Sequence, residues 1–128
     1  MFTCVIRYKT DPEKMKEFKE YGTLWMTLVE KYGGKHHGYF YPPSASEKTK
    51  MPSAVFSFAG MGGDADENEA FALFSFDSAE AYDAYREAVE ADEACIKATA
   101  KFTMSPCYTN YERAFLVPNF PDTKQSGP

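Results

Sequence analysis

The segment FALFSF (71–76) limits the possible folds more than any other feature, because every residue in it except Ser75 is apolar. Neighbouring side chains of a strand point to opposite faces of the sheet. A strand with this composition therefore places apolar side chains on both faces, and both faces need a cover. Any fold proposed for this chain has to provide those two covering layers.

Three other segments have the composition of strands, and turn residues mark several of their ends. They are FTCVIRY (2–8), the run 36–41 that Pro42 and Pro43 end, and YTNYERAFLV (108–117). Together with FALFSF they predict a sheet of four strands.

Helices are predicted between these strands from their start and stop signals. Asp11 followed by proline starts the first helix, and the glycine pair 33–34 ends it. Asp77 with Glu80 forms a capping-box-like start for a second helix, and Asp92 starts a short third one.

The element order is therefore β-α-β-β-α-(α)-β, which predicts a ferredoxin-like α+β fold with a four-stranded antiparallel sheet. The helices cover one face only, so we expect a second copy of the chain to cover the other, as a homodimer that pairs sheet against sheet. Residues 1–118 form the single expected domain, with an extended loop at 44–68. That loop either lacks regular structure or holds a short strand at AVFSFA (54–59), and the tail 119–128 frays or lies on a neighbouring subunit.

Charge and cysteine content limit the partners and the compartment. The net charge of −5 argues against nucleic acid or an anionic membrane as a partner, and no apolar run reaches the roughly 20 residues that span a bilayer. The N-terminal MFTCVIRYK does not read as a secretory signal. Cys4, Cys95 and Cys107 form no CxxC pair, which indicates free thiols and a cytoplasmic location.

Three blocks of the sequence together resemble the bacterial branch of the NIPSNAP family, of the dimeric α/β-barrel superfamily. They are GGKHHGYFYPP, ALFSFDSAEAYDAYR and YERAFLVP, in that order. The resemblance implies the ferredoxin-like subunit and the sheet-to-sheet dimer, whereas loop 44–68 is longer than the hairpin that it implies. It leaves the reaction open, because superfamily relatives include cofactor-free monooxygenases, isomerases, haem-handling enzymes and assembly domains.

The adjacent histidines of KHHG are the main candidates for chemistry. Regular alternation would group His36 with Phe40, and His37 with Tyr39 and Tyr41, so the pair cannot bind one metal ion. If Phe40 packs under the helices, the second group lines the barrel interior, where His37 is our predicted catalytic proton carrier. The alternative is a hydrogen-bonded core histidine beside interface tyrosines, and which histidine faces the interior stays open.

Two strand arginines complete the predicted site. Arg7 and Arg113 would hold an anionic group of a ligand alongside Tyr39 and Tyr41, or Arg7 would pair with Glu112 across neighbouring strands.

The function predicted from these residues is the binding of a small aromatic or anionic molecule, with a cofactor-free monooxygenase- or isomerase-like enzyme as an extension. A non-catalytic binding or assembly module is the alternative, and haem or metal handling through His37 is a minor one. No cofactor or metal is expected, since GMGGDA (60–65) lacks the helix of a dinucleotide loop and DADEN (64–68) lacks the later ligands of a calcium loop.

Overall fold

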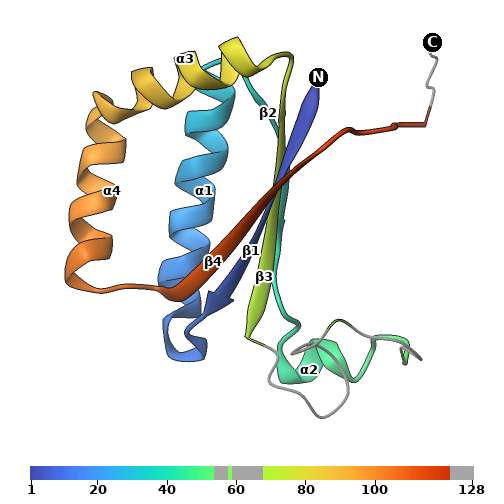
Figure 1. Cartoon of the computed structure of the whole chain (residues 1–128). Coiled ribbons are helices and arrows are strands. Elements are labelled where there is room, and N and C mark those ends of the chain that lie inside the picture. Colours follow the sequence, from blue (N-terminus) through green and yellow to red (C-terminus); the bar gives the residue numbers. More distant parts are fainter. Residues whose placement is uncertain (54–57, 59–67, 122–128) are drawn as a thin grey trace.

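The computed structural model describes residues 1–53, 58 and 68–121. Its elements, in chain order, are β1 (Phe2–Thr10), the 3-10 helix η1 (Pro12–Lys14), α1 (Met15–Lys31), β2 (Lys35–Phe40), α2 (Ala45–Lys48), β3 (Glu69–Phe76), α3 (Ala79–Glu90), α4 (Glu93–Met104) and β4 (Tyr108–Leu116). The four strands pair antiparallel in the order β2-β3-β1-β4. Helices α1, α3 and α4 lie on the same side of this sheet (Figure 1), which confirms the predicted ferredoxin-like α+β fold.

The predicted helix starts are confirmed at two of three places. Asp11 accepts a hydrogen bond from the Glu13 backbone N–H at the start of η1. Asp92 caps α4 as predicted. The predicted cap at Asp77 is wrong, because Ser78 has the extended backbone of an N-cap and its hydroxyl accepts from the Ala81 N–H at 3.0 Å.

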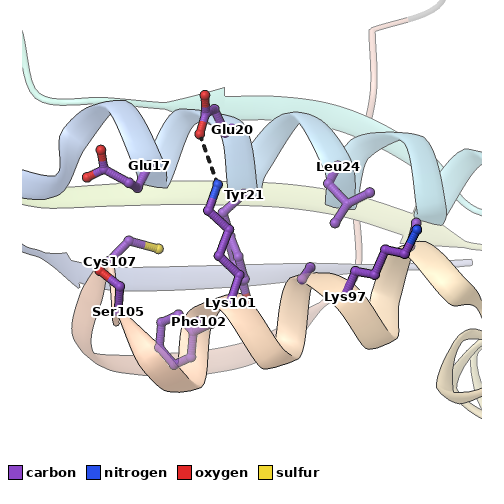
Figure 2. Close-up of a pocket in the computed structure, with 11 residues that line it drawn as sticks. Glu17, Glu20, Tyr21, Leu24, Lys97, Lys101, Phe102, Ser105 and Cys107 are labelled. Carbon is purple, nitrogen blue, oxygen red and sulfur yellow. Dashed lines mark ion pairs between the residues drawn. The ribbon is translucent and has the colours of Figure 1, made fainter.

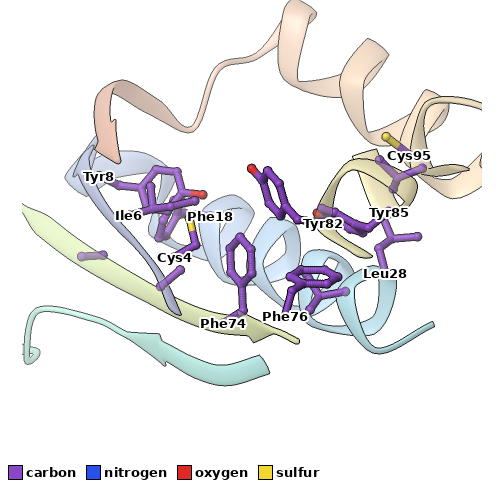
Figure 3. Packing of buried hydrophobic residues seen from close by; sticks show 14 of the residues in the cluster. Cys4, Ile6, Tyr8, Phe18, Leu28, Phe74, Phe76, Tyr82, Tyr85 and Cys95 are labelled. Atoms are coloured by element: carbon purple, nitrogen blue, oxygen red, sulfur yellow. The ribbon is translucent and has the colours of Figure 1, made fainter. Parts of the chain in front are cut away.

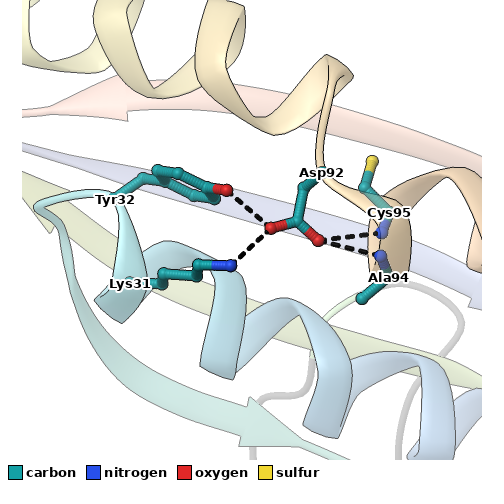
Figure 4. A network of polar contacts seen from close by, with 5 residues as sticks. All are labelled: Lys31, Tyr32, Asp92, Ala94 and Cys95. Atoms are coloured by element: carbon teal, nitrogen blue, oxygen red, sulfur yellow. Dashed lines mark hydrogen bonds and ion pairs between the residues drawn. The ribbon is translucent and has the colours of Figure 1, made fainter.

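Asp92 also joins the end of α1 to the start of α4 (Figure 4). Its Oδ2 accepts hydrogen bonds from the Lys31 ammonium at 2.8 Å and the Tyr32 hydroxyl at 2.5 Å. Its Oδ1 accepts from the backbone N–H groups of Ala94 and Cys95. The Lys31 and Tyr32 hydrogen bonds are the largest causes that hold the pKa of Asp92 well below its usual range.

The segment after β2 contains a short helix that the sequence analysis missed. Ser44 and Glu47 form a reciprocal capping box around α2, which lies beyond one end of β2 and β3 (Figure 1). The strand considered at 54–59 lies outside the described residues except for Phe58, and so do residues 59–67 of the loop and the tail beyond residue 121.

The core fills the space between the sheet and the helices (Figure 3). Strand alternation sends Cys4, Ile6 and Tyr8 of β1 toward the helices, and all three are buried. Phe18 of α1 and Phe76 of β3 are almost fully buried. Burying one such ring stabilises the fold by about 1.5–3 kcal/mol, so this aromatic layer holds the helices on the sheet.

The other face of the sheet carries apolar side chains without a helix above them. Phe71 and Leu73 of β3 belong to this face, as the run FALFSF predicts, and they pair in register with Phe40 and Gly38 of β2. The side chains of Phe40 and Leu116 are 54% and 55% exposed. We call this surface the open face.

Candidate functional site

A β-bulge in β2 decides where the two histidines point. His36 pairs with Phe74, the next paired residue is Gly38, opposite Leu73, and His37 stands unpaired between them. Gly38 has a φ of +112°, which glycine adopts without strain. The extra residue resets the alternation, so the predicted grouping of His37 with Tyr39 and Tyr41 is wrong.

His36 is the histidine that shares a face with the tyrosines. Its ring stacks on Tyr39 with centroids 5.2 Å apart and an interplanar angle of 6°. Tyr39 in turn stacks on Tyr41, and both tyrosines lie against Gly22 of α1. Phe40 therefore points to the open face, and the condition under which His37 would join the tyrosines is not met.

A cavity of about 200 Å³ lies between the helices and the sheet. Its lining comes from α1, β1, β2, β3, α3 and β4 and includes Tyr21, Trp25, His36, Tyr39, Arg86 and Arg113. Two predicted site residues, Tyr39 and Arg113, are therefore brought together here. Tyr41 packs next to the cavity, on Tyr39 and Phe18.

The His36 ring is neutral in this setting. Burial, followed by the neighbouring His37, lowers the pKa of His36 to about 4. Its Nδ1 accepts a hydrogen bond from the Gly38 backbone N–H at 2.9 Å. A neutral imidazole that accepts at Nδ1 carries its hydrogen on Nε2, so His36 offers a donor rather than a base.

The tyrosines of the cavity are also donors. Burial is the largest cause that raises the pKa of Tyr8, Tyr39 and Tyr85 far above the usual value. Their hydroxyls therefore stay protonated across the physiological range. Together with His36, they leave the described lining without a group that accepts a proton readily near neutral pH.

Two arginines make the cavity electropositive. Arg86 donates to the Tyr82 hydroxyl at 3.3 Å, which is the main cause that raises its pKa. Arg113, on edge strand β4, lies with its guanidinium carbon 5.6 Å from the centre of the Tyr111 ring. The described lining contains no Asp or Glu, so an anionic group of a ligand would meet only favourable charges.

Arg7 and His37 lie on the open face, away from this cavity. Arg7 faces Glu112 in the β1–β4 register, as predicted, and its side chain forms an ion pair with Glu69. His37 Nε2 lies 2.7 Å from the Ser75 hydroxyl, and the ring also contacts Phe120. The structure therefore splits the predicted site residues between the two faces of the sheet.

A separate groove of about 330 Å³ runs between α1 and α4 (Figure 2). Its floor includes Leu24 and Phe102, and Lys101 pairs with Glu20 across it at 3.5 Å. The groove is larger than the inner cavity, and two of its charged residues, Glu20 and Lys101, pair with each other. We take the inner cavity as the candidate site because it gathers polar side chains from five elements, β1, α1, β2, α3 and β4.

Other kinds of site find little support in the described part of the chain. The three cysteines are free and buried, and burial raises the pKa of Cys4 to about 11, which disfavours the reactive thiolate. Among residues 1–53, 58 and 68–121, no group of three His, Cys, Asp or Glu side chains is placed to hold a metal ion. No described helix is long and apolar enough to cross a membrane.

The sequence analysis did not name Trp25 and Arg86 as site residues, and it left open which of His36 and His37 faces the interior. For His36 a signal was present, because an isolated glycine inside a strand indicates a bulge, and Gly38 sets the bulge here.

Comparisons with known proteins support the fold. No family model and no curated protein matches the sequence. A solved NIPSNAP domain protein from Burkholderia xenovorans is similar with a TM-score of 0.63 and 19% identity, over 95% of this chain and 100% of that one. A Nitrosomonas europaea protein, named as a putative antibiotic biosynthesis monooxygenase, is similar with a TM-score of 0.58 and 9% identity, over 94% of this chain and 100% of that one. A variant of MhuD with two manganese protoporphyrin IX molecules per active site is similar with a TM-score of 0.55 and 14% identity, over 94% of this chain and 97% of that one.

These similarities confirm the fold that the resemblance to the NIPSNAP family predicted. At these identities they say nothing further of the chemistry.

Proposed function

We propose that this protein binds a small aromatic or anionic molecule in the cavity between its helices and its sheet. The observation that carries the proposal is the cavity itself, where aromatic rings surround a few polar groups from five elements. Mostly apolar walls with a few placed polar groups are typical of ligand sites. The cavity size, about 200 Å³, suits a ligand with one aromatic ring, since an engineered cavity of about 150 Å³ holds benzene.

Binding is better supported than proton transfer. His36 donates through Nε2, and the buried tyrosines stay protonated. A general base needs a free acceptor with a pKa near the working pH. A cofactor-free enzyme, suggested by the fold shared with the Nitrosomonas europaea protein, is therefore our second candidate.

Haem fits the cavity poorly. Pockets for drug-sized ligands measure about 300–1,000 Å³, and a porphyrin would need at least that space. The cavity is smaller. The Gly38 N–H also occupies Nδ1 of His36 and leaves the hydrogen of the neutral ring on Nε2, so neither nitrogen offers a free lone pair to iron. We therefore derive no step through haem.

We further propose that two copies pair through the open face. Phe40 and Leu116 are more than half exposed there, and Phe58 extends the apolar surface by packing on Phe71. Such a surface typically marks an interaction site. Analytical ultracentrifugation tests this, and a monomer at micromolar concentration would contradict it.

His37 remains a prediction as a functional residue, now on the open face. Its hydrogen bond to Ser75 continues to Thr3, whose hydroxyl lies 2.7 Å from that of Ser75. We expect His37→Ala to weaken dimerisation rather than ligand binding. Loss of ligand binding in a folded, dimeric His37→Ala protein would return this residue to the binding role.

The binding proposal is tested by native mass spectrometry of freshly purified protein, followed by titration with one-ring aromatic compounds. Trp25 is the only tryptophan of the chain and lines the cavity, so its fluorescence should report occupancy. An added small mass or a saturable change in Trp25 emission supports the proposal. No emission change with any compound at millimolar concentration would refute it.

A further inference from the structure

Two buried nitrogen atoms of the cavity lining have no hydrogen-bond partner among the described residues. They are Nε1 of Trp25, on α1, and Nε2 of His36, on β2. Buried polar atoms without a partner are rare in native proteins, and each one calls for an explanation. Here both unpartnered atoms belong to residues that line the same cavity.

Both atoms are donors. The indole Nε1–H can only donate. The Gly38 N–H occupies Nδ1 of His36, which leaves the hydrogen of the neutral ring on Nε2. The bulge accompanies this arrangement, because His37 stands unpaired between His36 and Gly38 and the Gly38 N–H donates to the His36 ring at 2.9 Å.

The remaining polar groups of the lining favour the same kind of ligand. Arg86 and Arg113 add positive charge, and the described lining has no carboxylate. The rings of Tyr8 and Tyr39 stack with their centroids 6.1 Å apart. A ligand that brings only donors or a positive charge would leave Trp25 and His36 unpaired.

We infer that the ligand is a one-ring aromatic compound with an acceptor oxygen, a carbonyl or a carboxylate, which accepts hydrogen bonds from Trp25 Nε1–H and His36 Nε2–H. This inference rests on the proposed function and adds the chemical class of the ligand. The arginines favour the carboxylate, and the two N–H donors alone serve either oxygen.

Four probes with the same ring and different head groups test the inference. They are benzoate, acetophenone, ethylbenzene and benzylammonium, titrated against the full chain by ligand-observed NMR and Trp25 fluorescence. We expect benzoate or acetophenone to bind about tenfold more tightly than ethylbenzene and benzylammonium to bind worst. Benzoate well ahead of acetophenone identifies a carboxylate ligand, and equal affinities identify a carbonyl.

Variants then assign the donors. Replacing Trp25 by its benzothiophene analogue keeps the shape and removes the N–H, and the replacement affects one site because the chain has one tryptophan. We expect benzoate affinity to fall about tenfold while ethylbenzene affinity stays. His36→Phe should also lower benzoate affinity and leave ethylbenzene affinity unchanged. The matched His37→Phe, on the other face of the sheet, should leave both affinities unchanged.

The outcomes separate this inference from the proposed function. If benzoate, acetophenone and ethylbenzene bind equally, the cavity binds ligands but the donor inference is overturned. Tightest binding of benzylammonium overturns it too. If no probe binds, both proposals fail. Should a variant lose its fold by circular dichroism, the four-probe series on the natural chain still decides.

Discussion

Gly34→Ala should be one of the most destabilising single-methyl changes in this protein. Gly34 lies between α1 and β2, and a methyl group built on it would lie 2.6 Å from Cζ of Phe76 and 2.7 Å from Cγ1 of Val29. Optimal carbon contacts are about 3.5–4.0 Å, so the overlap with each neighbour is about 1 Å. Phe76 and Val29 are each 1% exposed, and neither can turn out into solvent.

The expected loss lies at the upper end of the range for overpacking, about 3 kcal/mol. For a chain of this length, 1 kcal/mol lowers the melting temperature by about 4 °C, so the melting temperature should fall by about 12 °C. Urea denaturation followed by far-UV circular dichroism measures the free energy of unfolding directly.

Gly33→Ala is the matched control, one residue away. Gly33 has a φ of +96° and no atom within 4 Å of the added methyl, so its cost of about 1–2 kcal/mol is purely conformational. Phe76→Leu removes the ring atoms that Gly34→Ala would meet. Adding Phe76→Leu to Gly34→Ala should therefore restore about 1 kcal/mol of the free energy of unfolding relative to the sum of the two single losses. Adding it to Gly33→Ala should restore none.

Two results would refute this reasoning. One is a Gly34→Ala loss no larger than that of Gly33→Ala. The other is strict additivity of Gly34→Ala and Phe76→Leu, which would show that the ring is not the obstacle.

Three further predictions follow from the charges and surfaces. The folded state lowers the pKa of Asp92. The stabilising effect of its carboxylate is therefore full above the unfolded pKa of about 3.9 and is lost as the pH falls below that value. The urea midpoints of the natural chain and of Asp92→Asn should converge in acid. His36 has a folded pKa of about 4 against an unfolded value of about 6.5. The stability that its buried neutral ring contributes to the fold is therefore full above pH 6.5 and is lost as the pH falls toward 4. A histidine NMR titration should show His36 still neutral, with its hydrogen on Nε2, at pH 5.5, and an imidazolium there would contradict the tautomer. Phe40→Asp, placed on the exposed part of the open face, should abolish dimerisation in sedimentation experiments without lowering benzoate affinity, and an unchanged dimer would move the interface elsewhere.

The element order and the fold class could be predicted because their signals are local. Asp11 with its proline and Asp92 carry helix starts that depend only on neighbouring residues. The run FALFSF required apolar cover on both faces, and the structure shows Phe71 and Leu73 on a face without helices. Alternation along one strand is enough for that conclusion.

The site could be predicted only in part. Tyr39 and Arg113 were named from polar groups in aromatic strands, and both line the cavity. His37 and Arg7 were named on the same grounds and lie on the open face, because residue type does not specify a face. Tyr41 lies on the face of the cavity and packs next to it.

The sequence by itself determined the helices, the strands and the apolar character of both sheet faces, since each depends on side-chain type and spacing within a short segment. Only the tertiary structure decided which histidine faces the cavity, because the bulge at His37 depends on how β2 pairs with β3. It also decided the cavity itself, which joins Trp25 to His36 and to Arg113, far away in the chain. Those neighbours are set by strand register and helix packing, which no local spacing rule contains.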